Sequence, residues 1–257
     1  MNPTLYLIGQ LIVALLALGL VSATIYGLKE GLNKLAIPQK KRQQLVLYVR
    51  SGLLLWLALT GILAYFGFFN APDSFPPRPA FVLIPAIIFI LYLAFFSRLF
   101  RLLLKVIPEG WLIKIQTFRI LMELLLWMGF LGKFVPIQMT FLWLNQDIIV
   151  GLTAPFAAWL FFGKQRYQKP EAVMWNVFGI ALLINVLIIG IFSNPSPFRV
   201  FLNEPSSIFV NQFPFIWIVS FIVPFALAMH IFSLRQLLTN TTRPISRRFL
   251  ANRKLFR

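Results

Sequence analysis

Long apolar runs separated by short polar linkers recur along the whole chain of 257 residues. Each run is long enough for an α-helix to cross a hydrocarbon layer of roughly 30 Å. The first run is also too long for the apolar part of a cleaved signal peptide. The pattern therefore predicts an all-α polytopic transmembrane bundle over residues 1–238, with about seven helices at 5–28, 45–69, 80–101, 111–132, 147–163, 172–193 and 215–238.

The basic residues alternate between the linkers and give the predicted bundle an orientation. Nineteen of the 24 Lys and Arg residues fall in or beside the first, third and fifth linkers and the C-terminal tail. The second, fourth and sixth linkers carry one each, namely Arg78, Lys133 and Arg199. Because Lys and Arg concentrate in cytoplasmic loops, this alternation predicts an N-terminus outside and a C-terminus inside. The expected location is the cytoplasmic (inner) membrane, with several crossings.

Composition agrees with a membrane protein and excludes several kinds of chemistry. The chain is 59% hydrophobic and only 12% charged, whereas a soluble domain has about 25% charged residues. Its net charge of +17 resides between apolar runs and in the tail, which suits topology and anionic lipid headgroups better than nucleic acid. There is no cysteine and one histidine, so thiolate chemistry and a site with several histidine ligands are excluded. No cofactor is expected.

A polar stripe in the predicted helix 111–132 is the main candidate site. Gln116, Arg119, Glu123 and Trp127 are spaced so that they share one helix face. Arg119 and Glu123 are four residues apart, so they can pair along the helix. Since a charge in hydrocarbon is costly, this face should look into the bundle or a hydrated cavity. It is either a site for a substrate or a proton, or a structural ion pair that fixes the helix register.

Two further residues could join this site. Arg50 lies near the cytoplasmic end of helix 45–69, where it could snorkel to the interface or approach Glu123. His230, in the cytoplasmic half of helix 215–238, is either a hydrogen-bonded structural residue or part of a proton path with Glu123. Asn176 and Asn185 are nine residues apart on opposite helix faces and are expected to make separate interhelical hydrogen bonds.

A second candidate lies at the outer side. Segment 194–214 mixes phenylalanines with Arg199, Asn203 and Glu204, a composition that suits an interfacial element or a cap over an outer pocket. Asp147, at the mouth of helix 147–163, would lie nearby. At the other end, the basic tail 239–257 carries no acid and is expected to lie on the anionic cytoplasmic surface or to bind a protein partner. A homo-oligomer is the other expected assembly.

The stretches QTFRILMELLLW (116–127) and FRVFLNEPSSIFV (198–210) resemble polytopic membrane proteins of bacteria that have no assigned activity. The resemblance implies a helical inner-membrane protein and supplies no reaction. Three functions remain open on the residues alone. The first is transport of a small solute or protons through the polar face of helix 111–132. The second is a non-catalytic membrane subunit or sensor, and the third is a lipid-modifying enzyme at the outer interface that uses Asp147, Glu204, Arg199 and Arg78.

Overall fold

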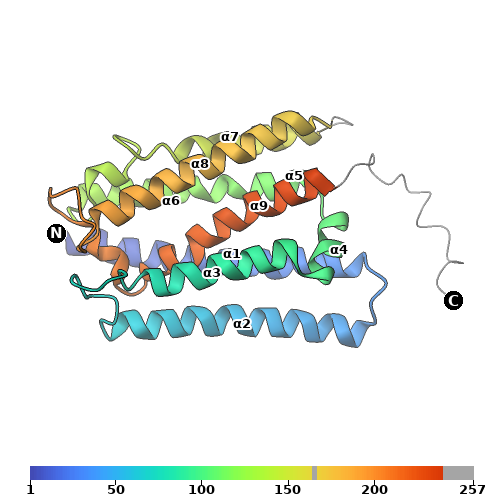
Figure 1. The fold of residues 1–257 in the computed structure, drawn as a ribbon, viewed down its shortest axis with the longest axis horizontal. Coiled ribbons are helices and arrows are strands. Elements are labelled where there is room, and N and C mark those ends of the chain that lie inside the picture. Colours follow the sequence, from blue (N-terminus) through green and yellow to red (C-terminus); the bar gives the residue numbers. More distant parts are fainter. Residues whose placement is uncertain (164–166, 240–257) are drawn as a thin grey trace, which may run out of the picture.

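The computed structural model describes residues 1–163 and 167–239, and these form an all-helical bundle without β-strands (Figure 1). Most helices run along the long axis of the bundle. The predicted basic tail lies outside the described residues, apart from Thr239. The α-helices are α1 (Pro3–Asn33), α2 (Gln39–Tyr65), α3 (Ala80–Phe95), α4 (Arg98–Val106), α5 (Glu109–Lys114), α6 (Phe118–Leu131), α7 (Ile148–Phe162), α8 (Lys169–Ser193) and α9 (Val223–Thr239).

Four helices in the described part of the chain are long and apolar enough to cross a membrane: α1, α2, α8 and the helix Ile218–Thr239, which joins the π-helical turn η4 (Ile218–Ile222) to α9. A fifth span results if α3 and α4 are counted together, although they are bent by 72°. The helix α7 is apolar but shorter. The count of seven crossings is taken up below as part of the proposed function.

The predicted helix 80–101 is divided into two helices in the structure. The helix α3 ends at Phe95, and α4 starts after Ser97, whose side chain accepts a hydrogen bond from the backbone N–H of Phe100. In α4, the cations Arg98, Arg101 and Lys105 follow helical spacing, while the opposite face buries leucines. A capped helix with one cationic face turns away from an apolar span, which explains the sharp corner.

The predicted helix 111–132 is also interrupted. A 3₁₀ turn, η1 (Ile115–Thr117), separates α5 from α6. After α6, residues 132–147 fold back into the bundle with little regular structure except the 3₁₀ turn η2 (Ile137–Met139). Many of their side chains are buried, including Val135, Gln138 and Asn145, which are 0% exposed. The short helix α7 therefore begins inside the bundle instead of at its end.

The core surrounds α9, which packs against α8, α5 and α3. Its buried face carries phenylalanines and small residues as well as His230 and Ser233. The connections gather at two ends of the bundle (Figure 1). The N-terminus, the segments 66–79 and 194–217 and the start of the inward-folded segment 132–147 lie at one end. The loop 34–38, the helix α4, the end of α7 and the start of α8 lie at the other.

Candidate functional site

A buried ion pair between two helices forms the centre of the candidate site. The guanidinium of Arg119, on the first turn of α6, donates from Nε to Asp147 Oδ2 at 2.6 Å and from Nη2 to Asp147 Oδ1. Asp147 directly precedes α7, so the pair joins the start of α7 to α6. Arg119 is 1% exposed and Asp147 is 5% exposed. Two parallel hydrogen bonds in such surroundings make a strong, geometrically specific contact.

His230 lies on the other side of the guanidinium, and its tautomer follows from its partners. Arg119 Nη1 is 3.0 Å from His230 Nε2, while His230 Nδ1 is 3.0 Å from Asn176 Oδ1. A guanidinium only donates, so Nε2 must accept. The imidazole hydrogen then lies on Nδ1 and is donated to Asn176. Both ring nitrogens of the 0% exposed histidine are thus occupied.

The network continues from His230 toward the ends of α8 and α9. Asn176 Nδ2 donates to Ser233 Oγ at 3.0 Å and to the backbone carbonyl of Ala172 at 2.7 Å. Asn176 is seven residues from the start of α8, and Ser233 is six residues from the end of α9. The start of α8 and the end of α9 lie at the end of the bundle with α4, so Asn176 and Ser233 are each within about two helical turns of that end.

On its other side the ion pair is connected to Glu123 through Asn145. Asn145 Oδ1 accepts from the backbone N–H of Asp147 at 3.0 Å, which orients the first turn of α7. Asn145 Nδ2 donates to both carboxylate oxygens of Glu123, at 2.8 and 2.9 Å, and to the carbonyl of Met139. Glu123 is 2% exposed, and its hydrogen bonds within the described part of the chain come from an amide and not from a cation.

A small cavity of about 50 Å³ adjoins these groups. Arg119, Glu123 and Asp147 contribute to its wall, and the rest of the wall is apolar. A water molecule takes about 30 Å³ in the liquid, so the space suits one or two waters and no larger solute. The two carboxylates and the guanidinium thus border one small cavity whose wall is otherwise apolar.

The other residues predicted for this site, Gln116 and Arg50, lie outside the ion pair. Gln116 is buried in η1 and donates to the carbonyl of Ala226, one turn before His230. Arg50 lies on the exposed side of α2, outside the network. The pair of Arg119 with Glu123 that the helical spacing allows is replaced by the pair with Asp147, because the segment 132–147 folds inward and brings Asp147 to the guanidinium.

The residues expected at an outer pocket divide into two places. Arg199 donates to Glu204 Oε1 at 2.8 Å and to the carbonyl of Asn203 at 3.0 Å. Asn203 in turn donates to Gln138 of the inward-folded segment. Glu204 is exposed, and the hydrogen bond from Arg199, followed by that from the backbone of Ser206, holds its carboxyl pKa below the usual value. Asp147 belongs to the buried cluster and not to this group.

We name the buried set the central cluster; it comprises Arg119, Glu123, Asn145, Asp147, Asn176, His230 and Ser233. Sequence reasoning found Arg119, Glu123 and His230 as one candidate site but did not include Asn145 or Ser233. Asn145 carried a usable signal, because an Asn side chain can accept from the backbone N–H two residues further on, here that of Asp147 directly before α7. Within residues 1–163 and 167–239, no group of three His, Asp or Glu side chains is arranged to hold a metal ion.

Comparison with known proteins gives a family and no activity. No curated protein and no solved structure matches the chain. A family model described as "Domain of unknown function (DUF8737)" matches residues 76–238, which span α3 to α9 and include the whole central cluster. Because this match covers more than half of the 257 residues, the chain belongs to that family of domains of unknown function.

Proposed function

We propose that the protein is an integral membrane protein with seven crossings whose central cluster moves protons, or a small solute together with protons. The surface of the bundle supports the membrane part of this proposal. Apolar side chains are exposed along its length; Leu15 on α1 and Leu55 on α2, for example, are each 70% exposed. The seven proposed crossings are α1, α2, α3, the interrupted helix α5–α6, α7, α8 and the helix η4–α9.

The distribution of charge between the two ends supports an orientation with the N-terminus outside. Among the residues that the structure describes, eleven Lys and Arg lie at the end with α4, namely Lys29, Lys34, Lys40, Lys41, Arg42, Arg98, Arg101, Lys105, Lys114, Lys169 and Arg235. The opposite end carries Arg78, Lys133 and Arg199. By the positive-inside rule, the end with α4 faces the cytoplasm. Lys40, on the first turn of α2, lies at that end.

Single-cysteine labelling tests this topology in a chain that has no native cysteine. We expect Lys40→Cys to react with a membrane-impermeant maleimide only after the cells are permeabilised. Lys133→Cys, exposed at the opposite end, should react in intact cells and serves as the matched control. Labelling of Lys40→Cys in intact cells would overturn the orientation.

The charges of the central cluster carry the proposal of proton movement. Arg119 and Asp147 neutralise each other, so the cluster contains one more acid than base. An ionised Glu123 leaves a net charge of −1 in an apolar interior, and a protonated Glu123 leaves a net charge of zero. Proton exchange at Glu123 is therefore the chemistry that this composition favours, and its small adjoining cavity suits water rather than a larger solute.

A proton on Glu123 can control the ion pair because both acids compete for one guanidinium. Glu123 and Arg119 are four residues apart on α6, which is the spacing for a pair along the helix. When Glu123 loses its proton, its carboxylate attracts Arg119 away from Asp147. That exchange releases the first turn of α7 and removes the donor from His230 Nε2. The two arrangements of Arg119 thus form a proton-driven switch between two positions of α7.

Proton flux in proteoliposomes tests this function. With a potassium diffusion potential and a pH dye inside the vesicles, the wild type should dissipate a pH gradient faster than empty vesicles. Glu123→Gln keeps the shape of the side chain but cannot release a proton, so its flux should fall to the level of empty vesicles. Glu204→Gln, which changes an exposed acid, should keep the wild-type rate.

Two outcomes would contradict proton movement. One is a wild-type flux equal to that of empty vesicles, and the other is equal flux for the wild type and Glu123→Gln. Thermal unfolding of each variant in detergent, followed by circular dichroism, distinguishes a lost proton site from a lost fold. A solute that requires the pH gradient would appear as faster gradient dissipation when that solute is added.

A further inference from the structure

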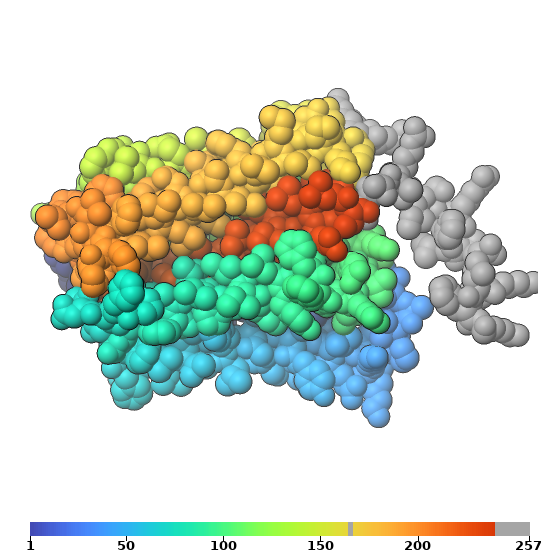
Figure 2. Space-filling view, viewed as in Figure 1, coloured from blue at the N-terminus to red at the C-terminus, as the bar shows by residue number. Residues whose placement is uncertain are grey.

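The fully buried residues of α2 lie in one half of the helix. They are Leu57, Thr60, Gly61 and Ala64, all in the half toward the end of the bundle with the N-terminus. There, Trp217 donates from Nε1 to the carbonyl of Leu57 at 2.9 Å. The helix α2 packs on α1, while α3 packs on α9 and η4. In the space-filling view, α2 (blue) and α3 (teal) lie next to one another on the face shown (Figure 2).

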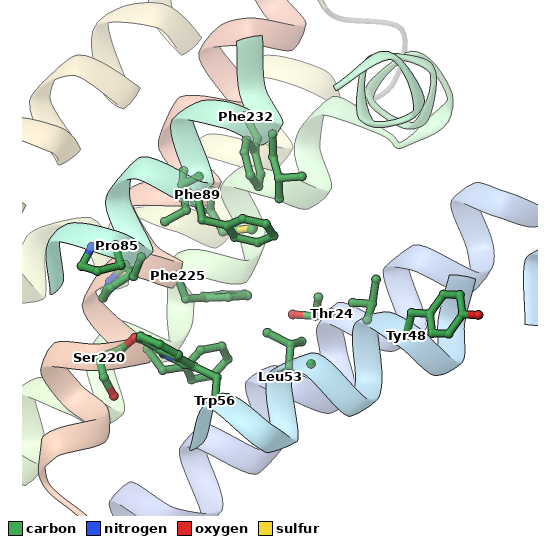
Figure 3. Close-up of a pocket in the computed structure, with 18 residues that line it drawn as sticks. Thr24, Tyr48, Leu53, Trp56, Pro85, Phe89, Ser220, Phe225 and Phe232 are labelled. Atoms are coloured by element: carbon green, nitrogen blue, oxygen red, sulfur yellow. The ribbon is translucent and has the colours of Figure 1, made fainter. Parts of the chain in front are cut away.

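The space between these helices is a lateral crevice of about 620 Å³. This volume is within the usual range of 300–1,000 Å³ for small-molecule sites. Phe89 of α3 and Phe225 of α9 face Leu53 of α2 and Thr24 of α1 across it (Figure 3). The wall is almost entirely apolar, so its ligand must be a hydrocarbon. At Gly52 an added Cβ would meet no atom within 4 Å, so the crevice is open there.

One end of the crevice is closed by a specific hydrogen bond. Pro224 lacks a backbone N–H, so the carbonyl of Ser220 loses its ordinary helical donor. Trp56 of α2 supplies the replacement from Nε1 at 2.9 Å. From Ser220 of η4 to Phe232 of α9 the crevice extends about 18 Å at 1.5 Å per residue. That length suits one extended acyl chain, because such a chain fills one leaflet, about half of a 30 Å hydrocarbon core.

A cation lies at the opposite end. The face of α9 that lines the crevice at Phe225, Ala228 and Phe232 continues one turn further to Arg235. The guanidinium of Arg235 stands over the Phe95 ring at 5.5 Å from its centroid, at the corner between α3 and α4. Its Nε is buried, and within the described part of the chain neither an acceptor nor a carboxylate reaches it.

We propose that the crevice binds one hydrocarbon chain of an anionic phospholipid of the cytoplasmic leaflet, whose phosphate contacts Arg235. The hydrocarbon wall, the length of one acyl chain and the unpaired cation at the cytoplasmic end all fit this one ligand. Arg98, three residues after Phe95, adds positive charge at the same corner. The inference rests on the proposed membrane embedding and orientation, and it is independent of proton movement at Glu123.

Native mass spectrometry of the full chain, extracted from membranes in a mild detergent, tests the crevice. The wild type should retain one phosphatidylglycerol-like anionic lipid per chain. Gly52→Phe fills the crevice without a backbone clash and should lose this lipid, and Ala86→Phe should do the same from the α3 wall. Gly19→Phe is the matched control, because Gly19 is exposed on α1 with equally open space but does not line the crevice.

Arg235 is tested by adding phosphatidylglycerol or phosphatidylcholine to delipidated protein. Arg235→Gln should reduce the preference for phosphatidylglycerol by about fivefold, as expected for one cation near a lipid phosphate. Arg235→Lys should retain the preference, and so should Lys105→Gln on α4. A wild type without bound lipid, equal retention by Gly52→Phe and Gly19→Phe, or a dimer in place of the lipid would each overturn the proposal. Proton flux measured on the same variants separates this outcome from failure of the proton proposal.

Discussion

Asp147→Ala is expected to destabilise the protein by about 3–5 kcal/mol, because it removes the carboxylate that is hydrogen-bonded to the buried guanidinium of Arg119. Arg119 is 1% exposed and donates hydrogen bonds to both carboxylate oxygens of Asp147. The remaining contact of its Nη1 with His230 does not neutralise its charge. The substitution also removes the group that joins the first turn of α7 to α6. Unfolding by sodium dodecyl sulfate in mixed micelles, followed by circular dichroism, measures the change in free energy.

The matched control for this prediction is the exposed pair at the outer end. Glu204→Ala removes the carboxylate from Arg199, which is a surface pair with an expected effect of at most about 1 kcal/mol. Replacing both buried partners, as Arg119→Met with Asp147→Leu, removes the buried guanidinium as well and should give a more stable protein than Asp147→Ala alone. If Asp147→Ala and Glu204→Ala lower the free energy of unfolding equally, the buried pair does not hold α7 to α6.

The helical class of the fold could be predicted from the sequence because length and hydropathy alone determine it. Apolar runs of sufficient length do not require knowledge of any contact between them. The corner at Ser97 was missed for a related reason. The apolar residues of α3 continue into α4 through Leu103 and Leu104, so hydropathy shows no break between the two helices. The break is made by the capping hydrogen bond of Ser97 and by the cationic face of α4.

The candidate site could be predicted only as far as one helix determines it. Helical spacing placed Arg119 and Glu123 on one face, and both are buried in the structure. The partner of Arg119 could not be predicted, since Asp147 comes from a segment that folds inward after a non-helical stretch. Hydropathy assigned that aspartate to the outer end, because charged residues next to an apolar run ordinarily mark its boundary.

The two sites proposed in this molecule use different faces of the same helix, α9. His230 faces the central cluster, whereas Phe225 and Phe232 face the lipid crevice. The π-helical turn η4 and Pro224 precede both sets, and such irregular turns occur frequently at functional sites. A change in the position of α9 would therefore alter the surroundings of both the ion pair and the proposed lipid. A substitution that displaces α9 should therefore change both the stability of the protein and its proton flux.

Gly179→Ala is expected to destabilise the protein by about 1–3 kcal/mol, the usual cost of overpacking in a close-packed interior. A Cβ at Gly179 of α8 would lie 2.3 Å from Cε1 and 2.5 Å from Nε2 of His230. The ring has little freedom to give way, since one nitrogen accepts from Arg119 and the other donates to Asn176. The methyl group must therefore displace α8 or break one of these two hydrogen bonds.

The same helix provides the control for this prediction. A Cβ at Gly190 would meet only the end of Met139 at 4.0 Å, so Gly190→Ala should be neutral or stabilising by up to about 1 kcal/mol, as alanine is in a helix. Thermal unfolding in detergent compares the two alanine variants directly, and proton flux shows whether displacing His230 also disturbs the central cluster. Since His230 contacts the guanidinium that both acids share, Gly179→Ala should change the flux and Gly190→Ala should not. Equal stability and equal flux for the two variants would mean that the imidazole is not fixed between Arg119 and Asn176.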